Sequence, residues 1–215
     1  TNAETLKVGL IGCGGRGSGA AMQALKADPN VVLHALGDIF PERFDTCLEG
    51  LKKVHGEKVK VDEGHKFVGF DAYQKVIDSG VDVVLLATPP HFRPLHLEAA
   101  IKAGKHIFCE KPVAVDAPGI RKVLELSRLA KEKNLSLVSG FCWRFHEPKR
   151  AVFGKINDGS IGEVMSIYNT YNTGGAWSFP RQEGWNDLQF QLRNWMYYTW
   201  LAGDHIVEQA VHSLD

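Results

Sequence analysis

The sequence predicts an α/β fold in which helices cover both faces of a doubly wound parallel sheet. Two observations predict it. Short, near-continuous apolar segments recur along the chain, and stretches with helical periodicity separate them. Strands buried on both faces have near-continuous apolar sequences, and strands that alternate with helices of this length form βαβ units. We therefore expect this fold over residues 5–145.

Five segments carry the strand pattern. The first of them ends in glycine, and the third is the most apolar. The predicted strands are Leu6–Gly12, Val31–Asp38, Val81–Thr88, His106–Cys109 and Leu135–Gly140. Because they are expected to run parallel, their carboxyl ends meet at one edge of the sheet, which is where open α/β sheets bind ligands.

Three segments between these strands are predicted as helices. Ser18–Ala27 is rich in alanine and leucine. Phe92–Ala103 is followed by Gly104, the residue type that most often ends a helix. Pro118–Lys133 has apolar residues at spacings of three and four and a basic face between them, so it is predicted to be amphipathic.

The pattern changes after Pro148. Gly162–Asn172 alternates like an antiparallel strand, and a helix is expected to begin near Asp204 and to be cut by the end of the sequence. We divide the chain into a first domain, residues 1–145, and the first part of a second domain, residues 146–215. The second domain is expected to be of the α+β class and incomplete in this chain.

The balanced charge limits the classes of partner. Lysine plus arginine and aspartate plus glutamate both total 25, so the formal net charge is zero. This balance gives no electrostatic reason to bind nucleic acid or a membrane surface, and no apolar run approaches the roughly 20 residues that span a bilayer. We expect a small-molecule ligand and a cytoplasmic protein. The first residue is threonine, so a removed export signal stays open.

The four cysteines are far apart and form no C-x-x-C pair. We therefore predict neither a disulfide framework nor a metal site. Their apolar surroundings in the sequence favour reduced thiols that pack in the core. These residues are Cys13, Cys47, Cys109 and Cys142.

A glycine-rich loop follows the first predicted strand. Gly12, Gly14 and Gly17 fit the pattern G-x-G-x-x-G, with Gly15 and Arg16 between the last two. The pattern alone is weak, but it lies here between a strand and a helix, as a dinucleotide-binding loop requires. The glycines permit a tight turn and close approach to a pyrophosphate, which the helix N-terminus then binds. The first domain is thus predicted to be a Rossmann fold.

Asp38 ends the second predicted strand, 21 residues after Gly17. A carboxylate at this place accepts hydrogen bonds from the hydroxyls of the adenosine ribose and repels a 2′-phosphate, which favours NAD over NADP. The alternative is an aspartate that caps a helix or forms a turn before Phe40 and Pro41. Arg16 or Arg43 could still bind a 2′-phosphate.

Two further motifs accompany the glycine loop. One is the stretch from Ala87 to Pro112, ATPPHFRPLHLEAAIKAGKHIFCEKP, and the other is Gly140–Phe145, GFCWRF. Together the three motifs resemble the Gfo/Idh/MocA family of NAD(P)-dependent oxidoreductases. The resemblance covers the whole chain and is strongest before about residue 150. It implies a second domain with a large, mostly antiparallel sheet.

The resemblance also implies site residues. In that family the lysine of Glu-Lys-Pro, here Lys111, lies beside the nicotinamide and the substrate. Trp143 and Arg144 match a position near the nicotinamide, with core packing and a surface ion pair as the alternatives. The remaining cofactor contacts that the resemblance implies are Thr88, Pro89, His91 and Glu110.

A second family signature places an aspartate and a histidine four residues apart on a helix. Here His212 takes the histidine place and Glu208 the aspartate place. Residues i and i+4 share one face of a helix, so both side chains could face one substrate. Glutamate for aspartate is a departure from the family. A hydrogen-bonded core histidine is the alternative for His212.

The resemblance implies an NAD-dependent dehydrogenase that acts on a secondary alcohol of a sugar or polyol, as a homo-oligomer. His212 would remove the hydroxyl proton, Lys111 would stabilise the developing charge on oxygen, and Glu208 would orient His212 or bind a neighbouring hydroxyl. Two alternatives remain. The protein could be a glycoside hydrolase or lyase that uses tightly bound NAD in an internal redox cycle, or a non-catalytic sensor of the dinucleotide.

Overall fold

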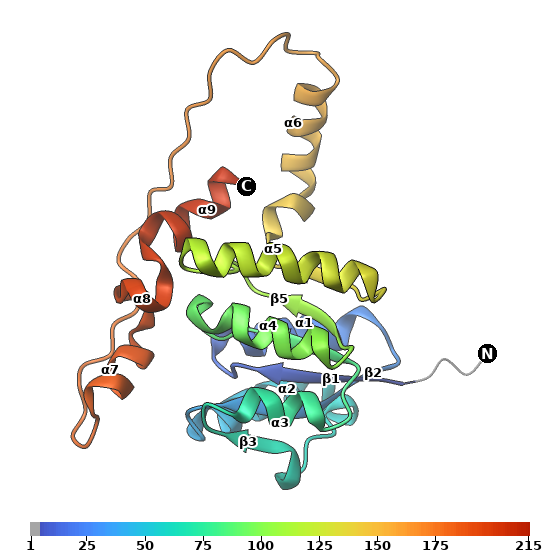
Figure 1. The fold of residues 1–215 in the computed structure, drawn as a ribbon, viewed down its shortest axis with the longest axis vertical. Helices are drawn as coiled ribbons and strands as arrows, with labels where there is room; N and C mark the ends of the chain where they lie inside the picture. The colour runs from blue at the N-terminus through green and yellow to red at the C-terminus, as the bar shows by residue number, and fades with distance from the viewer. Residues whose placement is uncertain (1–4) are drawn as a thin grey trace.

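A computed structural model describes residues 5–215 and contains one sheet of six parallel strands (Figure 1). The strand order is β3-β2-β1-β4-β5-β6, so the chain reverses direction across the sheet between β1 and β4. The strands are β1 (Leu6–Ile11), β2 (Val31–Asp38), β3 (Lys66–Val68), β4 (Val83–Leu86), β5 (His106–Cys109) and β6 (Leu137–Ser139). The predicted doubly wound Rossmann fold is confirmed.

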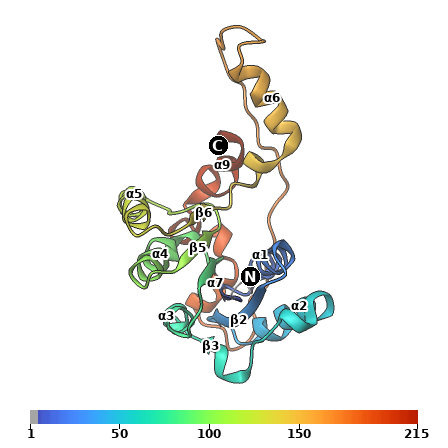
Figure 2. The ribbon, with the colours of Figure 1, turned by 90° about the vertical axis from the view of Figure 1, so that its right-hand side faces the viewer.

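Helices cover both faces of this sheet (Figure 2). One face packs against α1 (Gly15–Ala27) and α2 (Glu42–His55). The other packs against α3 (Ala72–Asp78), α4 (Arg93–Lys102) and α5 (Ala117–Glu132). Gly104 has a φ of 71°, as expected for a glycine that ends α4.

The five predicted strands and three predicted helices are all present, with β2 and β5 at the predicted bounds. Our predictions include no element between residues 39 and 80, where α2, β3 and α3 lie. In α2 the buried residues Phe44, Cys47, Leu48 and Leu51 do follow helical spacing. In contrast, β3 has only three residues, none of them buried, and carries little sequence signal.

The region after β6 is helical and extended. It contains α6 (Glu147–Asn157), α7 (Asp187–Arg193), α8 (Thr199–Ala202), a π-helical turn (Ile206–Ala210) and α9 (Val211–Leu214). The strand predicted for residues 162–172 is wrong for this structure, because those residues form an exposed coil. Its alternating side chains have no neighbouring strand among residues 146–215 with which to form a ladder.

The chain returns to the first part of the molecule after this coil. Leu192 and Leu201 pack with Phe40, which follows β2, in one buried cluster. The guanidinium of Arg193 lies 3.8 Å from the centre of the Phe40 ring and pairs with Glu42. Residues 187–202 therefore lie against the carboxyl edge of the sheet.

Three of the four cysteines are buried, as expected, and all four are free thiols. The prediction is wrong for Cys142, which is exposed because the chain leaves the sheet after β6. None of the helices formed by residues 5–215 combines the length and apolar character needed to cross a bilayer.

Candidate functional site

The glycine loop between β1 and α1 is tightly built at two of its positions. Gly12 has a φ of 96°, and a Cβ there would lie 2.7 Å from the backbone of Ala87 and Thr88. A Cβ on Gly17 would lie 1.8 Å from the carbonyl oxygen of Gly12. At Gly15, by contrast, a Cβ would meet nothing within 4 Å. The loop thus requires glycine where it packs on the sheet and leaves open space at the start of α1.

The N-terminus of α1 is suited to binding an anion. The helix begins at Gly15, and its N-cap residue, Gly14, has no side chain that could cap it. The first turn contains no acidic residue. Free backbone N–H groups and the positive end of the helix dipole therefore point toward the open side of the loop, which fits a pyrophosphate.

A cavity of about 480 Å³ lies at the carboxyl edge of the sheet, beside this loop. Gly12, Asp38, Gly69 and Thr88, which line it, end or follow the strands β1 to β4. Eight of the predicted cofactor residues line the cavity: Gly12, Gly14, Gly15, Arg16, Gly17, Asp38, Thr88 and Pro89. The predicted residues His91, Glu110, Lys111, Trp143 and Arg144 lie outside its lining.

Other lining residues were not predicted as cofactor contacts. Phe70 and Tyr73 come from the region of β3 and α3, and Trp177, Phe179 and Trp195 come from the far part of the sequence. Only the aromatic-rich composition near Trp195 is visible in the sequence as a signal.

Asp38 forms the turn that was the alternative to its predicted ribose contact, and it also lines the cavity. One carboxylate oxygen accepts a hydrogen bond from the Cys13 N–H at 2.7 Å, and the other accepts one from the Phe40 N–H at 2.9 Å. The hydrogen bond from Phe40 forms the turn that was the alternative interpretation of Asp38. Burial raises the pKa of Asp38, although both backbone bonds and Arg43 oppose this shift. The carboxylate thus ties the glycine loop to the end of β2 and still faces the cavity.

Two residues next to the cavity, Glu110 and Arg93, fix the backbone segments that line it. Glu110 follows β5 and pairs with Arg16 at 3.0 Å, and burial is the main cause that raises the Glu110 pKa. Arg93 is fully buried and donates hydrogen bonds to the carbonyls of Leu86 and Thr88 at 2.6 and 2.8 Å. The ion pair links the glycine loop to β5, and Arg93 fixes the backbone after β4.

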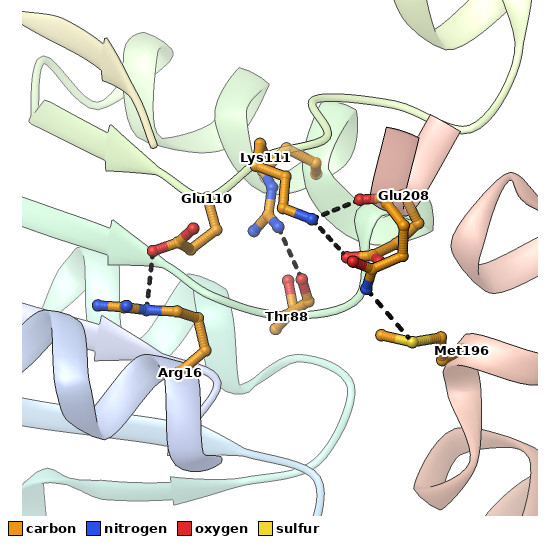
Figure 3. A network of polar contacts seen from close by, with 8 residues as sticks. Arg16, Thr88, Glu110, Lys111, Met196 and Glu208 are labelled. Atoms are coloured by element: carbon orange, nitrogen blue, oxygen red, sulfur yellow. Dashed lines mark hydrogen bonds and ion pairs between the residues drawn. The ribbon is translucent and has the colours of Figure 1, made fainter. Parts of the chain in front are cut away.

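Lys111 and Glu208 form a buried ion pair beside these residues. Figure 3 shows the two side chains facing one another, with Glu110 turned toward Arg16. Their Nζ–Oε1 distance is 2.8 Å, and the side chains are 10% and 6% exposed. Lys111 Nζ also donates to the backbone carbonyl of Glu208, and Gln209 donates to the other carboxylate oxygen. In the structure, therefore, the Glu208 side chain contacts Lys111.

His212 lies on α9 in a second cavity, of about 620 Å³. Its ring centre is 5.6 Å from that of Trp143 and 6.3 Å from that of Tyr171. Its Nδ1 atom is buried and has no hydrogen-bond partner within the described part of the chain. Burial, followed by the charge of Lys111, lowers the pKa of His212, and Asp215 opposes the shift. A neutral imidazole with a free nitrogen is thus favoured.

Trp143 and Arg144 line this second cavity with His212. The Arg144 guanidinium is exposed and pairs with Asp215 at 2.6 Å, which is the surface ion pair that was the alternative. The indole ring of Trp143 lies beneath Lys149, whose Nζ is 3.7 Å from the ring centre.

Comparison with known proteins identifies the family to which this chain belongs. A family model described as "Oxidoreductase family, NAD-binding Rossmann fold" (GFO_IDH_MocA) matches residues 6–141. The dTDP-3,4-didehydro-2,6-dideoxy-alpha-D-glucose 3-reductase of Actinomadura kijaniata is 28% identical over 88% of this chain and 50% of its own length. An inositol 2-dehydrogenase of Rhizobium meliloti is 33% identical over 76% of this chain and 44% of its own length.

A further relative, glycosyl hydrolase family 109 protein 4 of Phocaeicola vulgatus, is 27% identical over 89% of this chain and 37% of its own length. Among solved structures, a scyllo-inositol dehydrogenase from Lactobacillus casei with bound NAD(H) and scyllo-inositol is similar. Its TM-score is 0.60 at 25% identity, over 74% of this chain and 43% of that one. The chain spans about half the length, or less, of these curated relatives.

Proposed function

Because the chain belongs to the Gfo/Idh/MocA family of NAD-binding oxidoreductases, we propose that the protein transfers a hydride between NAD and a secondary alcohol of a sugar or polyol. The observation that carries the proposal is the buried Lys111–Glu208 pair. It stands at the same edge of the sheet as the glycine-loop cavity, with His212 close enough for Lys111 to lower its pKa. Relatives described as a sugar 3-reductase and an inositol 2-dehydrogenase support the substrate class.

The residues at the first cavity fit a dinucleotide. The open backbone at Gly15 and the uncapped start of α1 would hold the pyrophosphate, and Asp38 would accept hydrogen bonds from the adenosine ribose. When bound, the nicotinamide accepts or supplies the hydride. The protein supplies binding, orientation and charge.

Lys111 would bind the alcohol oxygen of the substrate. As an ammonium held in a buried position, it can stabilise negative charge that develops on that oxygen. Glu208 balances this charge in the free protein and fixes the direction of the side chain. The helical spacing predicted that Glu208 orients His212. We infer instead that Glu208 positions Lys111.

His212 would take the hydroxyl proton. Its lowered pKa keeps the imidazole neutral near pH 7, and the unpartnered Nδ1 can accept a proton from a substrate hydroxyl. The neutral side chain and the ammonium of Lys111 would then act on one oxygen, the first as base and the second as electrostatic stabiliser.

A substrate panel tests the proposed function. The protein is incubated with NAD⁺ and a series of inositols, hexoses and small monohydric alcohols, and NADH is followed by its absorbance. We expect NADH to accumulate with a ring polyol or sugar and none with the monohydric alcohols. NADH formation with none of the compounds, under conditions where NAD⁺ is shown to bind, would contradict a net dehydrogenase.

An internal redox cycle is the second candidate, because one relative is described as a glycosyl hydrolase. In such a cycle NAD is regenerated in each turnover, so a glycoside is cleaved without net NADH. The same panel, extended with aryl glycosides, separates the two candidates. Release of the aryl group at constant NADH, from protein that keeps NAD through dialysis, would favour the cycle.

Asp38 provides a prediction about cofactor choice. Asp38→Asn removes the charge that repels a 2′-phosphate and keeps an acceptor for one of the two backbone N–H groups that Asp38 binds. We expect the ratio of the NADPH to the NADH dissociation constant to fall about 10-fold, measured by calorimetry, since Arg43 lines the same cavity and remains. Asp45→Asn, at an exposed position on α2, is the matched control. An unchanged ratio would remove Asp38 from cofactor discrimination.

A further inference from the structure

The cavity beside the glycine loop has walls from two distant parts of the sequence. On one side lie the loop, Asp38 and residues after β3 and β4; on the other lie Trp177, Phe179, Leu192, Arg193 and Trp195. Trp177 and Phe179 remain 45% and 40% exposed although they are large aromatic residues. Apolar rings that are exposed at a cavity are typical of a binding site for a flat ligand.

The far wall is held in place by specific contacts. The Asn194 side chain, itself only 2% exposed, accepts from the Phe179 N–H at 2.7 Å and donates to the Phe179 carbonyl at 3.1 Å. The Tyr197 hydroxyl donates to the carbonyl of Ala176 at 2.6 Å. Leu192 and Arg193 anchor the same segment on Phe40, as described above. The aromatic residues are therefore presented by a fixed backbone.

The position of Asp38 identifies which end of a dinucleotide would lie here. Asp38, Phe40 and Arg43 line the cavity at the end of β2, where the adenosine ribose is expected. Phe70 follows β3, and its ring is 6.1 Å from that of Phe92. Trp177 and Trp195 contact each other edge to face, with 5.8 Å between ring centres. An adenine ring gains stability by stacking on such side chains.

We propose that residues 176–195, the aromatic cover, complete the cofactor site, and that Trp177 and Trp195 bind the adenine and slow release of the dinucleotide. The inference rests on the proposed function only in requiring that NAD binds. It adds a binding role for a part of the chain outside residues 6–141, the Rossmann region that matches the family model.

Two substitutions test the aromatic cover in the intact chain. Trp195→Ala and Trp177→Ala are each expected to weaken binding of ADP-ribose, which contains adenosine and pyrophosphate but no nicotinamide, about 10-fold, as measured by calorimetry. Release of NADH, followed by stopped-flow fluorescence, should be faster by a similar factor. Trp195→Phe keeps a stacking surface and should stay within about threefold of the unmodified protein. Tyr168→Ala removes an aromatic side chain that is 93% exposed and lies outside this cavity, so it is the control.

The outcomes separate this inference from the proposed function. No binding of NAD by the unmodified protein would overturn both. Binding of NAD with unchanged ADP-ribose affinity and NADH release in Trp195→Ala and Trp177→Ala would overturn the aromatic cover alone. Tighter binding in either variant would also overturn it, because the segment would then compete with the cofactor. Thermal melting of each variant checks that the protein is folded, and Trp177, being half exposed, is the safer of the two positions.

Discussion

Replacing Lys111 with methionine is expected to lower kcat about 100-fold or more while the affinity for NAD stays within about threefold. In the proposed mechanism the ammonium is one preorganised group that stabilises charge on the reacting oxygen, so its loss should affect the transition state more than the ground state. Lys111 does not line the glycine-loop cavity, which is why NAD binding should persist. Steady-state kinetics with the substrate found in the panel, together with calorimetry, measure the two effects.

The buried partner of Lys111 requires a control for stability. Removal of one member of a buried ion pair leaves the other charge uncompensated, which costs about 3–5 kcal/mol. The double variant Lys111→Met/Glu208→Gln removes both charges and should recover much of the melting temperature without recovering kcat. Lys122→Met, which breaks an exposed pair with Glu98, should change neither. Activity that returns with stability in the double variant would show that Lys111 acts only in folding.

Local patterns made the fold and the glycine loop predictable. The central strands β2 and β4 are short, largely apolar and mostly buried segments, and the signal lies within the segment itself. Gly12 and Gly17 are required by contacts with residues of the loop and of the neighbouring strand. The expected place of Asp38 follows from the same βαβ unit. A sequence pattern that is confined to one such unit needs no knowledge of distant contacts.

Distant contacts account for what could not be predicted. Lys111 and Glu208 are 97 residues apart, and helical spacing alone pointed Glu208 toward His212. A π-helical turn at Ile206–Ala210 changes the direction of side chains that an α-helix would align. The wall formed by Trp177 and Trp195 depends on how the chain returns over the sheet after an exposed coil. No periodicity in the sequence encodes that return.

Replacing His212 with alanine is expected to remove the acid limb of the pH–rate profile, along with about 100-fold or more of kcat. In the proposed mechanism the base is the neutral imidazole, so the rate should fall as pH falls through the pKa of His212. Burial and the charge of Lys111 lower this pKa, so the midpoint of the limb should lie below the ordinary histidine value of about 6.5. His205→Ala removes an exposed histidine that precedes the same turn and should leave the limb unchanged.

Replacement of Glu208 and replacement of Lys111 should shift the pKa of His212 in opposite directions. Glu208→Gln removes the carboxylate that balances Lys111, so the ammonium acts more strongly on His212, and the midpoint should shift to lower pH. Lys111→Met removes the positive charge, so the pKa should rise; because this variant is slow, an NMR titration of the His212 imidazole measures it. If Glu208 were the base, Glu208→Gln would abolish the limb and His212→Ala would keep it. Shifts of the His212 pKa in opposite directions in these two variants would show that the charge of Lys111 acts on His212 and that Glu208 partly compensates this charge. A purely structural role for Glu208 would not produce such shifts.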